Sequence, residues 1–236
     1  MTESPASTGV AELSPHDTEE DLDRIATGFA IGSLLFAAGT VAVWLDSRAV
    51  VANTIFLVGS VCFTAAAAIQ LGVSERQVPA IGRHRLLNPE WLSSAVQLLG
   101  TLFFNVLTVR SVLVAAGSTR LNAQEVWHPD YVGSVLFLIA SWLAWHPVGR
   151  RLRHGLVRGR SHWILLLNMI GSILFAVSAW GALPVGEDSI NNVAAANWGN
   201  FLGALAFLAG ALLLLPPRRP APGSGGQPRP ETEPTR

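Results

Sequence analysis

The chain has 236 residues, of which 50% are apolar and 14% are charged, and its formal net charge is zero. A soluble domain carries about 25% charged residues. The apolar residues also gather in long runs, most of them near the ~20 residues that cross a bilayer core. Composition therefore argues against a soluble helical bundle and favours an integral membrane protein, for which we expect no nucleic-acid partner.

Six hydrophobic segments follow a polar, acidic stretch at residues 1–24, which we interpret as a disordered tail with at most a short helical turn. The segments cover residues 25–45, 51–71, 91–109, 131–145, 163–183 and 193–215. A second disordered tail, rich in Pro, Gly and Arg, is expected at 217–236. The sequence thus predicts an all-α membrane protein with six transmembrane helices over 25–216, arranged as helical hairpins at 25–71, 91–145 and 163–215.

The distribution of Arg predicts the orientation, because the chain has no Lys. Six spans place both termini on one side of the membrane, together with the loops at 72–90 and 146–162. That side holds every Arg except Arg48, Arg110 and Arg120. Positive residues are in excess in cytoplasmic loops, so both termini are expected to be cytoplasmic.

A five-residue pattern recurs once in each hydrophobic segment: Gly, a small residue, two further residues and Phe. The six copies are Gly32, Ser33 and Phe36; Gly59, Ser60 and Phe63; Gly100, Thr101 and Phe104; Gly133, Ser134 and Phe137; Gly171, Ser172 and Phe175; and Gly203, Ala204 and Phe207. In alternate segments the glycines recur at a nearly constant period of about 70 positions. This spacing predicts an internal repeat of three hairpins, which is common in membrane folds.

The pattern has a physical interpretation as a packing unit. Positions i and i+4 share a helix face, so each Gly lies one turn from its Phe. Lipid provides no hydrophobic drive for helix association, and small residues permit the close approach that dispersion requires. We therefore expect the glycines to face neighbouring helices, with a ligand surface as the alternative.

The pattern also resembles that of YrhK-like bacterial membrane proteins, which look like two-helix units with Gly-Ser-x-x-Phe inside a span. The resemblance is carried chiefly by residues 25–71 and 161–216, while Thr101 and Ala204 depart from it. It implies a hairpin architecture and a bacterial inner (cytoplasmic) membrane. It implies no catalytic residue and no activity, because the family has none assigned.

Amide side chains inside the segments are the first candidate site. They are Asn53, Gln70, Gln97, Asn105, Asn168 and Asn200. These amides would form a polar site for a small solute, with Asn105, Asn168 and Asn200 lining the path, or they would form hydrogen bonds between helices. Asn168 and Asn200 each precede a motif glycine by three residues, which places both one helical turn from it.

Charged loops are the second candidate. The loop at 146–162 could hold anionic lipid head groups, although orienting the chain already accounts for its arginines. Those residues are Arg150, Arg151, Arg153, Arg158 and Arg160. On the opposite side, Glu125, His128, Asp130, Glu187 and Asp188 are either metal ligands or solvated loop residues.

The sequence offers no arrangement for catalysis. Cys62 is the only thiol and has no His in its segment, and no phosphate loop, dinucleotide fingerprint or zinc-protease motif is present. We expect no enzyme activity, no cofactor and no metal. The favoured hypothesis is a multi-pass membrane protein acting through helix packing with lipid or protein partners. The alternative is a small transporter or channel for a neutral solute.

Overall fold

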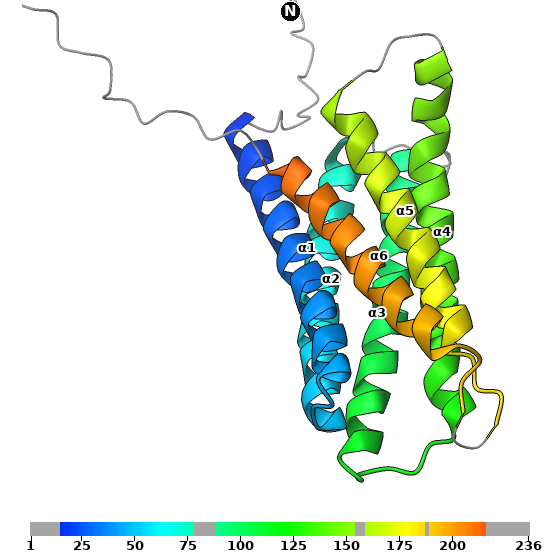
Figure 1. The fold of residues 1–236 in the computed structure, drawn as a ribbon. Coiled ribbons are helices and arrows are strands. Elements are labelled where there is room, and N and C mark those ends of the chain that lie inside the picture. Colours follow the sequence, from blue (N-terminus) through cyan, green and yellow to red (C-terminus); the bar gives the residue numbers. More distant parts are fainter. Residues whose placement is uncertain (1–14, 78–87, 154–158, 187–188, 216–236) are drawn as a thin grey trace, which may run out of the picture.

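The computed structural model describes residues 15–77, 88–153, 159–186 and 189–215, and the elements in this part of the chain are helical apart from one isolated bridge between Pro184 and Ile190. The described helices are α1 (Pro15–Trp44), α2 (Ala49–Gln77), α3 (Pro89–Ala115), α4 (Ala123–Arg153), α5 (Arg160–Gly181) and α6 (Val193–Leu214) (Figure 1). Five of these described helices are long and apolar enough to cross a membrane, and α4 is not among them.

The six helices form a closed ring in chain order. Each packs against its neighbours in the sequence, and α6 packs against α1 to complete the circle. Figure 1 shows the start of α1 and the end of α6 at one end of the bundle, with the turns inside the hairpins at the other. We call these the open end and the turn end, because a cavity described below lies near the first.

Helix α1 begins ten residues earlier than the hydrophobic segment. Residues 15–24, which the sequence assigned to a disordered tail, belong to the helix. Arg24 pairs with Glu20 one turn before it, and Arg76 of α2 pairs with Asp21. These pairs let a charged first stretch extend the helix. The remaining parts of the two expected tails, 1–14 and 217–236, lie outside the described residues.

Helix α4 also exceeds its hydrophobic segment, at both ends. Asn122 and Glu125 form a reciprocal capping box, in which each side chain accepts a hydrogen bond from the other's backbone N–H, both at 2.8 Å. Pro129 has no N–H to donate to the Glu125 carbonyl four residues earlier. Arg110 of α3 donates to that carbonyl instead, at 2.5 Å. Residues 123–130, which precede the predicted hydrophobic segment, therefore belong to α4.

The motif glycines lie at the contacts inside each hairpin, and the contacts are reciprocal. A Cβ added to Gly32 would lie 2.7 Å from the Phe63 ring, and one added to Gly59 would lie 2.9 Å from Phe36. The equivalent distances are 2.8 and 2.5 Å for α5 and α6 but 3.2 and 3.3 Å for α3 and α4. Each Gly therefore accommodates the Phe of the partner helix, most tightly in the first and third hairpins.

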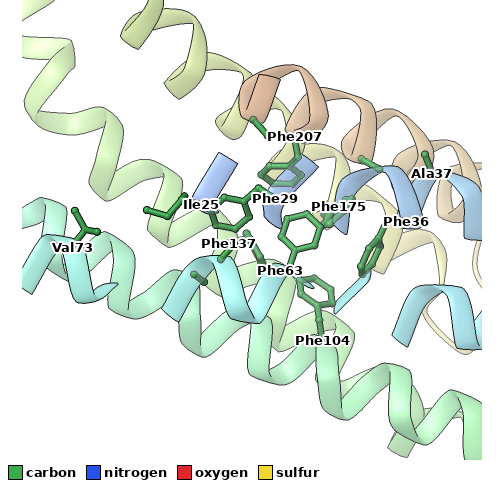
Figure 2. Close-up of a cluster of buried hydrophobic side chains, with 14 residues drawn as sticks. Ile25, Phe29, Phe36, Ala37, Phe63, Val73, Phe104, Phe137, Phe175 and Phe207 are labelled. Atoms are coloured by element: carbon green, nitrogen blue, oxygen red, sulfur yellow. The ribbon is translucent and has the colours of Figure 1, made fainter. Parts of the chain in front are cut away.

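The six motif phenylalanines meet in the centre of the ring (Figure 2). Those of α1, α3 and α5 form one triangle, with ring centroids 5.8–6.4 Å apart, and those of α2, α4 and α6 form another, at 5.8–6.4 Å. Within each hairpin the two rings are 5.1–5.6 Å apart. All six are at most 5% exposed. We call these two triangles the Phe cluster.

Contacts between hairpins use hydrogen bonds rather than rings alone. Ser60 of α2 lies 3.0 Å from the Thr108 hydroxyl of α3, and Ser172 of α5 lies 2.7 Å from the Ser141 hydroxyl of α4. In both pairs, one partner follows a motif glycine directly and the other follows a motif glycine by eight residues. At the third junction Ala204 replaces the serine of the motif, and Thr40 of α1 instead accepts a hydrogen bond from Asn200 of α6 at 2.7 Å.

Candidate functional site

A cavity of about 440 Å³ lies between the Phe cluster and the open end of the bundle, with residues of all six helices in its wall. Its inner end is formed by Phe29 together with the α2, α4 and α6 triangle of the Phe cluster. Its outer end includes Leu22 near the start of α1 and Leu214 at the end of α6. The cavity therefore runs along the axis of the ring and stops at the packed rings.

One wall of the cavity is polar and uncharged along most of its length. It consists of Gln70 and Ser74 from α2 and Ser93, Ser94 and Gln97 from α3. Ser93 donates to the Ala140 carbonyl of α4 at 2.8 Å, and Ser94 donates to the Glu90 carbonyl at 3.0 Å. Gln70 donates to the Ser94 hydroxyl at 3.4 Å. These bonds fix the wall and join α2, α3 and α4.

The wall contributed by α6 and α1 is apolar. Helix α6 presents Gly210, Ala211 and Leu214, and α1 presents Leu22 and Ile25. Because α3 and α6 lie on opposite sides of a six-helix ring in chain order, the polar and apolar walls face one another across the cavity. The cavity is thus amphipathic from side to side, in addition to having an aromatic inner end.

Two amides in the cavity are not engaged by the rest of the described structure. The side chains of Gln97 in α3 and Asn168 in α5 form no hydrogen bond with other described residues, although both are partly buried. The Asn168 Oδ1 lies beside Gly210, where a Cβ would be 3.1 Å away. Glycine at this position leaves room for the amide between α5 and α6.

Among the described residues, the cavity lining contains one charged side chain. Glu90, an exposed residue in the first turn of α3, belongs to the lining, and no Arg or His does. Glu90 lies in the first turn of α3, and Ser161 of the lining lies in the first turn of α5. The interior of the described cavity therefore offers amides, hydroxyls and aromatic rings but no fixed positive charge.

The three amides expected to form a polar path are placed differently by the structure. Asn168 lines the cavity, whereas Asn105 donates to Thr64 of α2 at 2.8 Å and Asn200 donates to Thr40. The last two hold neighbouring hairpins together, and neither lines the described cavity. Gln97 was among the candidate amides but not in the predicted path, and it lines the cavity. The signal was available, because Gln97 precedes Gly100 by three residues as Asn168 precedes Gly171.

The charged candidates contribute little to this site. Arg160 donates to the carbonyls of Leu213 and Leu215 at the end of α6. The side chains of Arg150, Arg151 and Arg153, and the whole of Arg158, lie outside the described part. Within the described residues no group of three His, Cys, Asp or Glu side chains is close enough to hold a metal ion. Glu187 and Asp188 of the expected acidic group also lie outside that part.

Comparisons with family models, with curated proteins and with solved structures find no match to this chain. The cavity and the packing around it are the basis of the functional assignment that follows.

Proposed function

We propose that the protein is a multi-pass inner-membrane protein that holds a small uncharged solute in the cavity at the open end of the helix ring. The cavity carries the proposal: its volume of about 440 Å³ falls within the roughly 300–1,000 Å³ of small-molecule sites, which are mostly apolar with a few placed polar groups. This is the neutral-solute alternative of the sequence interpretation, restricted to binding.

Binding from one end, rather than passage through the ring, is favoured by the Phe cluster. The buried rings fill the axis of the helix ring at the inner end of the cavity. A through-channel would require six buried side chains to separate. Packing with lipid or protein partners remains the second candidate function, supported by large apolar side chains that the helix ring leaves exposed, such as Leu34 and Val61.

The proposal includes six membrane crossings with both termini cytoplasmic, a bacterial inner membrane and no enzyme activity. The position of α4 in the ring beside five apolar helices supports a sixth crossing. Descent from a YrhK-like two-helix unit repeated three times is also part of the proposal. It is supported by the same Gly–Phe exchange in each hairpin. We expect α1–α2 to superpose on α5–α6 with Gly32 over Gly171.

Ligand-induced stabilisation tests the binding function. Benzamide, a small uncharged probe, should raise the unfolding temperature of the protein in lipid nanodiscs. Ala144→Phe, which places a ring in the cavity, should abolish that increase. Leu34→Phe is the matched control, because Leu34 is 58% exposed on the bundle surface and the variant should respond as the parent does. An unchanged response in Ala144→Phe would place the probe outside the cavity.

Cysteine labelling tests the side on which the cavity opens. In a Cys62→Ser background, an impermeant reagent should label Ala144→Cys from the cytoplasmic side and Ser189→Cys from the opposite side. Ser189 lies in the connection between α5 and α6 at the turn end. Labelling of Ser189→Cys from the cytoplasm would reverse the proposed orientation while leaving the binding site in place.

A further inference from the structure

We infer that the cavity selects a neutral amphipathic molecule, with an apolar ring or chain packed on the phenylalanines and one uncharged group that both donates and accepts hydrogen bonds, held by Gln97 and Asn168. This inference rests on the proposed binding function and names the chemical class of its ligand. It assigns these two amides as the residues that determine specificity.

The apolar half of the ligand is indicated by the inner end of the cavity. Phe29, Phe63, Phe137 and Phe207 all contribute to it, and the last three are held rigidly by one another, with centroids 5.8–6.4 Å apart. Aromatic rings favour offset or edge-to-face contact with other apolar groups. A ligand ring or short chain that reaches this end would be covered on several sides.

The polar half is indicated by the two amides without partners. An amide side chain provides both a carbonyl acceptor and N–H donors, so Gln97 and Asn168 together match a ligand amide, urea or alcohol. Both side chains are partly buried and line the cavity without a hydrogen-bond partner among the described residues, so their donors and acceptors remain available to a ligand. Ser93 and Ser94 of the polar wall already donate to carbonyls. The amides are therefore the groups that a ligand would complete.

Charged ligands are disfavoured by the same lining. A carboxylate in the interior would meet no Arg or His among the described lining residues, and an unpaired charge removed from water costs far more than a neutral polar group. Glu90 adds to the repulsion of an anion at the open end. Among the described lining residues a cation would meet a negative charge only at Glu90, away from the aromatic end that binds its apolar part.

Three probes of similar size separate these requirements: benzamide, toluene and benzoate. They share a six-membered ring and differ in carrying a neutral amide, a methyl group or an anionic carboxylate. Binding to the full-length protein in nanodiscs should be tightest for benzamide. The variants Gln97→Leu and Asn168→Leu should each weaken benzamide by about 2- to 10-fold, the range for one net hydrogen bond, and leave toluene unchanged or slightly tighter. Gln124→Leu is the matched control, because Gln124 lies in the first turn of α4 at the turn end and does not line the described cavity.

The outcomes distinguish the ligand class from the binding function. If toluene binds as tightly as benzamide and neither amide variant alters the ratio, the inferred ligand class is wrong while the cavity remains a binding site. If benzoate binds best, the electrostatic argument is wrong. If no probe binds, or if all three bind equally to Ala144→Phe, the proposed function fails and the ligand class with it.

Discussion

The contacts inside the hairpins and the contacts between them are built from different interactions. Inside each hairpin a glycine accepts the phenylalanine of the partner helix, and the exchange is reciprocal. Between hairpins the same level of the bundle is joined by hydroxyls and amides, as in the Ser60–Thr108 and Asn200–Thr40 pairs. Close Gly–Phe packing acts in the first case, whereas in the second hydrogen bonds add to the more distant ring contacts of the Phe cluster. The hairpins should therefore be more robust than the junctions between them.

The largest effect on stability is expected at Phe175, which contacts one ring inside its own hairpin and rings of both other hairpins. Phe175 approaches Phe36, Phe104 and Phe207 with centroids 5.1–5.8 Å apart and is 3% exposed. Phe175→Ala should lower the free energy of unfolding by about 3–5 kcal/mol, the range for such truncations in packed cores. Chemical unfolding in detergent measures this. Trp180→Ala, at a side chain that is 55% exposed, is the control, and equal losses would mean that the Phe cluster is not a core.

The next effect concerns the glycines that admit these rings. Gly171→Ile should cost roughly 1–3 kcal/mol through overpacking, because a Cβ there already lies 2.8 Å from the Phe207 ring. Gly72→Ile in α2 is a matched control, since a Cβ at Gly72 meets nothing within 4 Å. Thermal unfolding of both variants makes the comparison. If Gly171→Ile matches its control, the motif is not a packing contact and the ligand-surface interpretation regains support.

The six copies of the motif also differ in how closely they pack. An added Cβ at Gly100 or Gly133 would lie 3.2 or 3.3 Å from the phenylalanine of the partner helix. A small side chain such as that of Ala should therefore be tolerated at these two glycines better than at Gly171 or Gly203.

The smallest effect comes from the hydroxyls between hairpins. Ser60→Ala removes the bond to Thr108 and should cost about 0.6 kcal/mol, and at most about 1.7. Ser33 occupies the same motif position in α1 and is fully buried, but its hydroxyl has no partner among the described residues. Ser33→Ala should therefore be neutral or slightly stabilising, since it removes an unpaired polar group. Parallel unfolding curves test the pair, and a larger loss for Ser33→Ala would contradict the assignment.

The sequence predicted the helical architecture well because hydrophobic runs report burial and lipid contact directly. It placed the helix ends poorly where polar contacts extend a helix beyond its apolar run. Residues 15–24 depend on the Asp21–Arg76 pair, and residues 123–130 depend on the Asn122 cap and on Arg110. The Asp21–Arg76 and Arg110–Glu125 contacts join residues 55 and 15 positions apart, so no local pattern indicates them. The Asn122–Glu125 capping box, by contrast, has a local three-residue spacing that the sequence interpretation did not use.

The candidate site was harder to predict than the helices. Inspection of amides as a class could not separate those that join helices from those that face the axis, because the distinction depends on rotation about each helix. Position relative to the motif glycine carries part of that information. Gln97 and Asn168 lie three residues before the motif glycine in α3 and α5, and both line the cavity. Asn200 has the same spacing in α6, but α6 runs in the opposite direction, and Asn200 donates a hydrogen bond to Thr40 of α1 instead.

The closed ring has a consequence for how the chain folds. Five of its six helix junctions join neighbours in the sequence, whereas the α1–α6 junction joins residues as far apart as Thr40 and Asn200, which are separated by 160 positions. Forming a contact between distant residues requires a larger loss of chain entropy, and non-local contacts slow folding. The α1–α6 junction is therefore expected to form last. A circular permutant that connected α6 to α1 and opened the chain between α2 and α3 would keep every contact and move the last step to the new opening.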